Sequence, residues 1–79
     1  MRILFFAQLK DVTGCSEIEW SRGTPLDGEG LWNRLLNDFP GLAKHRASVR
    51  IARNGAYAAA DEEFQPDDEV ALIPPVSGG

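Results

Sequence analysis

One segment of the chain has the apolar spacing of a long helix, and strand-like segments flank it on both sides. Leu31, Leu35 and Phe39 repeat at i+4, with Trp32 and Leu36 beside them, and together they form a wide apolar stripe. The chain has only 79 residues, so it can bury only a small core. Packing one helix across one sheet is the economical way for such a chain to bury the stripe. The pattern therefore predicts a single domain of the α+β class.

The sequence also contains signals for the two ends of this helix. Thr24 can cap it, Pro25 suits the first helical position, and Asp27 lies where a capping box places an acid. Pro40-Gly41 is expected to end the helix. A short helical turn is expected over residues 42–46.

Five segments have the composition of strands. Asn54-Gly55 is the strongest hairpin signal in the chain, and Val12-Thr13-Gly14 is read as the turn between the first two strands. The order predicts a mixed sheet of about five strands packed on one main helix, which is the β-grasp (ubiquitin-like) fold, as one domain over residues 1–79. A ferredoxin-like fold would need a second long helix. The strands are expected at 2–8, 16–20, 49–53, 56–59 and 69–73, with a turn at 66–68.

The parity of side chains along these strands predicts two unlike faces. Phe6 and Ile73 are expected to point away from the helix, with Tyr57 beside them. An exposed apolar patch of this kind indicates an interaction site, and the alternative is that local loops cover Phe6 and Ile73. The face toward the helix is expected to hold Ile3, Phe5, Val70 and Leu72.

The C-terminal segment follows directly on the last predicted strand. Pro74-Pro75 ends that strand and favours an extended, polyproline-like exit. Gly78 and Gly79 carry no side chain, so they can thread a narrow passage. The segment spans at most about 20 Å. We therefore predict a flexible functional tail that carries a carboxylate into a partner's active site, the alternative being a frayed end. Its residues are Pro74, Pro75, Val76, Ser77, Gly78 and Gly79.

A terminal carboxylate is an unreactive acyl donor until one of its oxygens becomes a leaving group. Adenylation by ATP would supply that leaving group, and attack by sulfur would then leave a thiocarboxylate.

Composition excludes several other functions. Eight Lys and Arg against twelve Asp and Glu give a net charge of −4, which argues against nucleic-acid binding and against an anionic membrane surface. Cys15 and His45 are the only residues of their kinds, so we expect no disulfide, no metal site, no bound cofactor and no catalytic constellation. Cys15 is read as a free structural thiol, with a persulfide relay as the alternative, and His45 as a surface residue. With neither a long apolar run nor a signal-peptide core, a cytoplasmic location is expected.

Two charge clusters are read mainly as solvated surface. An acidic group lies next to the tail in sequence and is expected to form solvated turns or to steer a basic partner. A basic group is expected to form a solvated face. The acids are Asp61, Glu62, Glu63, Asp67, Asp68 and Glu69, and the cations are Lys44, Arg46, Arg50 and Arg53.

Four motifs together carry a resemblance that spans the whole chain. MRILFFAQLKDVTG, RNGAYA, PDDEVALI and the ending PPVSGG resemble the ubiquitin-like sulfur carriers, the family of the molybdopterin synthase small subunit and the thiamine-pathway carrier. The resemblance implies that an E1-like adenylyltransferase activates Gly79 with ATP and that Gly79 becomes a thiocarboxylate. It further implies that the tail enters the large synthase subunit. Its sulfur then helps build the molybdopterin dithiolene from cyclic pyranopterin monophosphate.

The same resemblance implies a docking surface and an assembly. Partner contacts would fall on Phe6, Lys10, Tyr57 and Ile73, in a heterotetramer of two small and two large subunits. The small subunit would itself be non-catalytic. The alternatives are a carrier for thiamine or a sulfur amino acid, or a ubiquitin-like modifier. One departure is Asp67, where the family usually has Gly, and Asp tolerates a left-handed turn.

Overall fold

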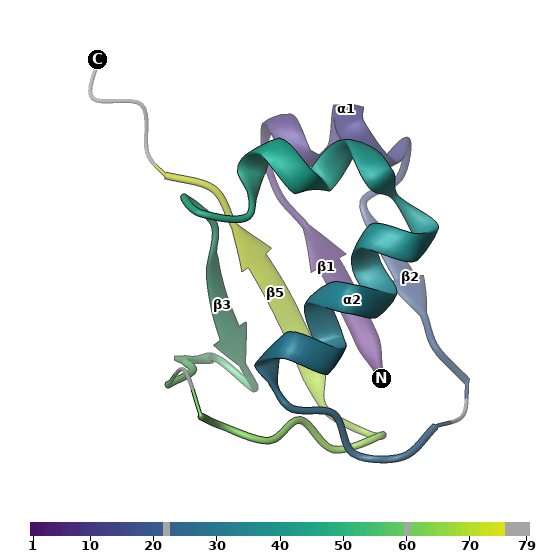
Figure 1. Ribbon diagram of the computed structural model, residues 1–79, viewed down its shortest axis with the longest axis vertical. Helices are drawn as coiled ribbons and strands as arrows, with labels where there is room; N and C mark the ends of the chain where they lie inside the picture. The colour runs from purple at the N-terminus through teal and green to yellow at the C-terminus, as the bar shows by residue number, and fades with distance from the viewer. Residues whose placement is uncertain (22, 60, 76–79) are drawn as a thin grey trace.

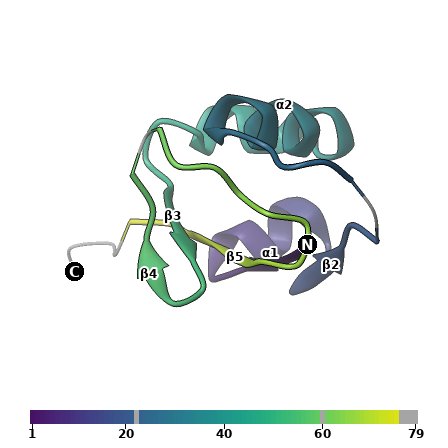
Figure 2. The same cartoon turned by 90° about the horizontal axis from the view of Figure 1, so that it is seen from below.

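The computed structural model describes residues 1–21, 23–59 and 61–75. A long helix, α2, crosses one side of a sheet, and the short helix α1 and the 3₁₀ helix η1 lie near one end of it (Figure 1). Figure 2 shows α2 on one side of the sheet. The elements in order are β1 (Arg2–Phe5), α1 (Gln8–Thr13), β2 (Glu17–Glu19), α2 (Gly28–Asp38), η1 (Pro40–His45), β3 (Arg50–Arg53), β4 (Ala56–Tyr57) and β5 (Glu69–Ile73).

The sheet is mixed and five-stranded, with the order β2-β1-β5-β3-β4. β1 pairs antiparallel with β2 and parallel with β5, while β3 pairs antiparallel with both β5 and β4. The predicted β-grasp architecture is therefore confirmed. Because β5 is the central strand, hydrogen bonds to β1 and β3 hold it on both edges.

The core forms where α2 meets the sheet. Leu31 and Leu35 of α2 are fully buried, and Trp32 is nearly so. The rings of Phe5 and Phe39 pack in a T-shaped arrangement, with 5.6 Å between ring centroids. From the sheet, Ile3, Phe5, Val70 and Leu72 are buried, so the parity of the predicted core face is confirmed.

The start of α2 differs from the predicted one. Asp27, rather than Thr24, is the N-cap, and its Oδ1 accepts a hydrogen bond from the Gly30 amide at 2.7 Å. Leu26 forms a backbone bridge with Phe64, with N–H···O distances of 2.9 and 2.7 Å in the two directions. This bridge requires extended backbone at Leu26, so the helix can begin only after it, and Pro25 is not its first residue.

The first strand is also shorter than predicted. β1 ends at Phe5, and Ala7 has a φ of 51°, which turns the chain into α1. α1 buries Leu9 and ends at Gly14, whose φ of 79° is left-handed and whose amide donates to the carbonyl of Lys10. The predicted three-residue turn before Cys15 is therefore the end of a helix, and Gly is favoured there because it has no Cβ to strain.

The β3–β4 hairpin turns where it was predicted to turn. Asn54 and Gly55 have φ values of 51° and 89°, as a tight hairpin turn of type I′ requires. The returning strand is shorter than expected, since β4 covers only Ala56 and Tyr57, although the Ala58 amide still donates to the Ile51 carbonyl at 2.9 Å.

The chain between α2 and β3 is helical, in agreement with the predicted short turn. α2 ends at Asp38, and η1 begins at Pro40 and buries Leu42. No helix in the described ranges is long and apolar enough to cross a membrane.

Candidate functional site

The end of β5 fixes the root of the predicted tail. Ile73 is the last residue of β5 and pairs with Arg50 of β3. Pro74, which follows, is buried, whereas Pro75 is exposed. The chain therefore leaves the domain between these two prolines, beside β3 (Figure 1). The other predicted tail residues, Val76, Ser77, Gly78 and Gly79, lie outside the described part of the chain.

Apolar side chains gather on the sheet face that points away from α2. The register aligns Leu4 with Ala71, Ala71 with Ala52, and Ala52 with Tyr57. Phe6 lies one residue beyond the Phe5–Leu72 pair and is 45% exposed, while Tyr57 is 65% exposed. The alternative that loops cover Phe6 is therefore wrong. We call this surface the open-face patch, which consists of Leu4, Phe6, Tyr57, Ala71 and Ile73.

The structure places the four predicted docking residues on two kinds of element. Phe6 and Ile73 each follow the last pair of the β1–β5 ladder, Phe5 and Leu72, and Tyr57 lies on an edge strand of the same sheet. Lys10 is exposed on α1, outside the sheet. Their role in partner binding remains a prediction.

Arg50 connects the tail root with the edge of the sheet. Its guanidinium lies 5.1 Å from the centre of the Tyr57 ring, in a cation–π arrangement. Arg50 is also the ladder partner of Ile73, and its strand β3 lies between β4, which carries Tyr57, and β5, which leads into the tail. Arg50 therefore contacts the exposed Tyr57 ring from the position that pairs with the last residue of β5.

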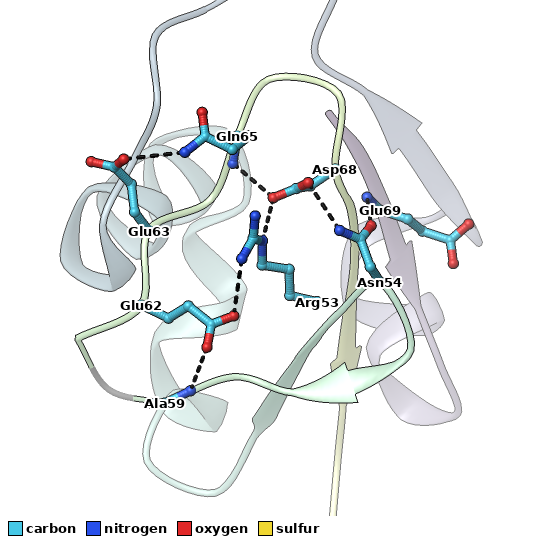
Figure 3. Close-up of polar contacts among 8 residues, drawn as sticks. All are labelled: Arg53, Asn54, Ala59, Glu62, Glu63, Gln65, Asp68 and Glu69. Carbon is cyan, nitrogen blue, oxygen red and sulfur yellow. Dashed lines mark hydrogen bonds and ion pairs between the residues drawn. The ribbon is translucent and has the colours of Figure 1, made fainter.

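A polar network holds the opposite end of β5 (Figure 3). Asp68, which precedes β5, is only 7% exposed. It accepts hydrogen bonds from Arg53 Nε, from Asn54 Nδ2 at 3.0 Å and from the Gln65 amide at 2.8 Å. Asn54 Oδ1 in turn accepts from the Glu69 amide at 2.9 Å. The β3–β4 turn is thereby bonded to the first residue of β5.

This network stabilises the ionised form of Asp68. Burial alone raises the pKa of the Asp68 carboxyl, but the hydrogen bonds from Arg53, the Gln65 amide and Asn54 outweigh burial and lower that pKa overall. Arg53 also approaches Glu62 Oε2 at 3.4 Å, and its own pKa is raised, first by the hydrogen bond to Asp68. A buried carboxylate with this set of donors is a structural anchor.

Three expectations about charge are therefore wrong. The acidic cluster does not lie beside the root of the tail, because its last members precede β5 while Pro74 follows β5, at opposite ends of the strand. Asp68 is not part of a solvated turn, and Arg53 is ion-paired rather than part of a free basic face. The sequence showed Asn54 only as a turn residue and Asp68 only as an acid in a cluster, and gave no signal that they meet.

The described residues offer few groups for other chemistry. Within residues 1–21, 23–59 and 61–75, no three metal-ligating side chains cluster. Cys15 is half-buried, and its Sγ lies 3.8 Å from both the carbonyl oxygen and the Oγ1 of Thr13. His45 is half-buried at the end of η1. The described residues do show an exposed apolar patch on the sheet and a chain that leaves the fold after Pro74.

Comparisons with known proteins agree with this arrangement. The human molybdopterin synthase sulfur carrier subunit is 32% identical over 82 residues, an alignment that covers 100% of this chain and 93% of the human protein. The subunit of the same name from Mycobacterium tuberculosis is 33% identical over 82 residues, covering 100% and 96%. The crystal structure of SAMP1, a small archaeal modifier protein from Haloferax volcanii, superposes with a TM-score of 0.83 at 29% identity, covering 100% of this chain and 98% of SAMP1.

The family assignment rests on the whole chain rather than on its ending. The ThiS family model matches residues 3–79, which include every helix and strand described above except Arg2, the first residue of β1. With its β-grasp fold, this chain therefore belongs to the ThiS family of ubiquitin-like sulfur carriers.

Proposed function

We propose that this protein is the sulfur-carrier subunit of a molybdopterin synthase and that it carries sulfur as a thiocarboxylate on Gly79. The observation that supports this most directly is the position of the root of the tail, Pro74 and Pro75. The central strand β5 ends in Pro74 and Pro75, the first buried and the second exposed, beside an exposed apolar patch. A family member with this geometry presents its last residues to a partner while its fold stays fixed.

Two steps would load the sulfur. A carboxylate oxygen of Gly79 attacks the α-phosphate of ATP on an E1-like adenylyltransferase, and pyrophosphate leaves. Sulfur at the oxidation level of hydrosulfide then attacks the carbonyl carbon of the Gly79 acyl-adenylate, and AMP leaves with the electrons of the broken C–O bond. The product is a thiocarboxylate, whose sulfur is a soft nucleophile. This domain contributes the acyl group and its placement, and the partner enzymes contribute the acid–base groups.

Delivery of the sulfur requires a docking surface. Ordering the tail inside the large synthase subunit costs about 1–2 kcal/mol per residue, so burial of other surface must compensate. We propose that the open-face patch supplies this burial through Phe6, Tyr57 and Ile73, with Lys10 as a charged contact beside it. In the complex, sulfur would pass from Gly79 to cyclic pyranopterin monophosphate and form the dithiolene, in an assembly of two small and two large subunits.

Intact-mass measurement tests the loading step. The full chain is incubated with an E1-like adenylyltransferase, ATP and a sulfur donor, and we expect the mass increase of one oxygen-to-sulfur exchange, located in the C-terminal peptide. Deleting Gly79 should abolish the increase without changing the circular dichroism spectrum or the melting temperature. An unchanged mass with several such enzymes, in reactions where a known carrier is loaded, would contradict the proposal.

A second readout identifies the pathway. Loaded protein, the large synthase subunit and cyclic pyranopterin monophosphate should together yield molybdopterin. Loading without this product would instead favour a carrier for thiamine or for a sulfur amino acid.

The likeness to Haloferax volcanii SAMP1 favours one alternative, a protein modifier. In that case the activated Gly79 carbonyl would be attacked by a lysine amine, and an isopeptide bond would replace the thiocarboxylate. Covalent adducts that form in cell extract and survive reduction by a thiol would support this role. Their absence in an extract that consumes the thiocarboxylate would support sulfur transfer.

A further inference from the structure

A groove opens along the β4 edge of the sheet, on a different part of the surface from the open-face patch. It has a volume of about 890 Å³ and lies between β3–β4, the segment after η1 and the first turns of α2. Its apolar wall includes Val49, Ile51 and Ala58, and Phe64 also contributes. Its rim reaches Tyr57, so the groove adjoins the open-face patch.

Two arginines give this groove its charge. The guanidinium of Arg46 lies 5.6 Å from the ring centre of Trp32, and that of Arg50 lies 5.1 Å from the ring centre of Tyr57. Neither arginine has a carboxylate within ion-pair distance among the residues that the structure describes. Among the lining residues that the structure describes, Glu29 is the one acid. The groove is therefore apolar along its wall and cationic at two separate points.

Other charged residues lie around the two arginines of the groove. Lys44 lies in η1, close in sequence to Arg46 and outside the described ion pairs. Of the acidic residues 61–69, Glu62 lies beside the groove, where it accepts a hydrogen bond from the Ala59 amide and pairs with Arg53. Asp68 and Glu69 lie at the start of β5, whereas the ladder pair of Arg50 and Ile73 lies at its end. An acidic protein thus shows a basic surface next to the root of its tail, and this surface attracts an anionic partner in a defined orientation.

The shape of the groove favours an extended polypeptide over a compact anion. The two guanidiniums stack on different rings from different elements, so they do not converge on one phosphate-sized point. β4 is the edge strand, and its outer backbone groups can pair with an added strand. A strand with alternating side chains would place its apolar residues on the wall and its carboxylates near the arginines.

We propose that this groove docks an extended segment of a partner protein in which acidic and apolar side chains alternate. Apolar burial and β4 pairing hold the segment, while Arg46 and Arg50 select its charge. The inference goes beyond the proposed sulfur transfer, because it concerns a surface of the folded domain and does not need the Gly79 chemistry.

An NMR titration of the full chain tests the inference. The probe is a short capped peptide of alternating glutamate and valine, and a peptide of alternating lysine and valine is the control. The glutamate peptide should shift the amide signals of Val49, Ile51 and Ala58 and bind more weakly as salt rises. Replacing either Arg46 or Arg50 by Ala should weaken binding about two- to fivefold. Glu29→Gln should strengthen it.

Arg34 provides a matched control. It stacks on Trp20 at 4.2 Å, in the same kind of cation–π contact but outside the groove, so Arg34→Ala should leave peptide binding unchanged. The inference is overturned if no signal shifts, if the lysine peptide binds equally, if the shifts map to Leu4, Phe6, Ala71 and Ile73 instead of the groove, or if only a compact anion such as AMP binds the groove. Intact-mass loading of the same variants separates these outcomes from a failure of sulfur transfer.

Discussion

The two ends of β5 differ in how the fold holds them. At its start, Asp68 is buried and bonded to Arg53, Asn54 and the Gln65 amide. At its end, the chain passes from buried Pro74 to exposed Pro75 within one residue. One strand therefore connects an end anchored by hydrogen bonds to the end at which the chain leaves the fold, which we call the presenting end. Pairing with β1 and β3 holds the two ends at a fixed distance.

A small domain can in this way keep its central strand firmly held while the chain leaves the fold at one end of that strand. In the described ranges, no buried side-chain nitrogen or oxygen lacks a hydrogen-bond partner. The polar groups near the start of β5 are thus fully satisfied and can specify the sheet. Substitutions at the start and middle of β5 should change stability, and substitutions beyond its end should change only transfer.

The largest expected effect is in the buried middle of β5. Leu72 is fully buried, so Leu72→Ala should lower the free energy of unfolding by about 2–5 kcal/mol. Chemical denaturation measures this loss. Ile73→Ala is the matched control, since Ile73 is only half-buried on the other face, and it should cost clearly less. Equal losses at the two positions would show that the helix-facing side of β5 is not the dominant core.

Removing the anchor should have the next largest effect. Asp68→Ala leaves Arg53, Asn54 and the Gln65 amide without their acceptor, and we expect the free energy of unfolding to fall by about 1–3 kcal/mol. Asp67, the exposed neighbour, serves as the control, because Asp67→Ala should change the free energy of unfolding by less than about 0.5 kcal/mol. Sulfur loading of the folded Asp68→Ala protein should match that of the wild type. A loading defect would mean that the two ends of β5 are coupled.

Acid should weaken the same anchor. The folded state lowers the pKa of Asp68 below its ordinary value of 3.8, so the unfolded chain binds the proton first as pH falls. The stabilisation that ionised Asp68 provides is complete above its ordinary pKa and is lost as pH falls through the lower pKa of the folded state. We therefore expect the stability difference between wild type and Asp68→Asn to shrink below about pH 4.

A second carboxylate provides the control for this pH dependence. The hydrogen bond and charge of Arg2 lower the pKa of Glu17, so Glu17 contributes acid sensitivity of the same sign. Glu17→Gln should therefore leave the Asp68 component intact when denaturation is followed across the same pH range. A pH profile identical for wild type and Asp68→Asn would contradict the anchoring role.

The smallest expected effect is at the presenting end. Pro75 is exposed, so Pro75→Gly should change the free energy of unfolding by less than about 0.5 kcal/mol. The added backbone freedom should slow sulfur transfer about two- to fivefold, because more conformations must be lost on docking. Single-turnover transfer to the large synthase subunit measures the change. A marked loss of stability would show that Pro75 belongs to the folded domain.

Local patterns in the sequence predicted much of this fold. The i+4 stripe located α2, strand parity separated Ile3 and Phe5 from Phe6, and Asn54-Gly55 located a hairpin turn. Each of these signals depends on neighbours within a few residues in the sequence, and the structure confirms the prediction made from each one.

Predictions failed where a distant contact overrode a local signal. Thr24 and Pro25 form a good helix start, but the bridge between Leu26 and Phe64 keeps this segment extended and moves the cap to Asp27.

The helix α1 was missed for a different reason, because a six-residue helix carries little periodicity, although Gly14 at its end was a usable signal.

Neighbouring residues were enough to predict the single long helix and the segment that follows the last strand, and four motifs spread along the chain carried the resemblance to the family. Tertiary structure alone decided where the charges lie. Asp68 reaches Arg53 across 15 positions and becomes an anchor, while Arg46 and Arg50 come to line a groove with Trp32 and Tyr57. The physical reason is that charge acts through space, and only strand pairing and helix packing set the distances between groups far apart in the chain.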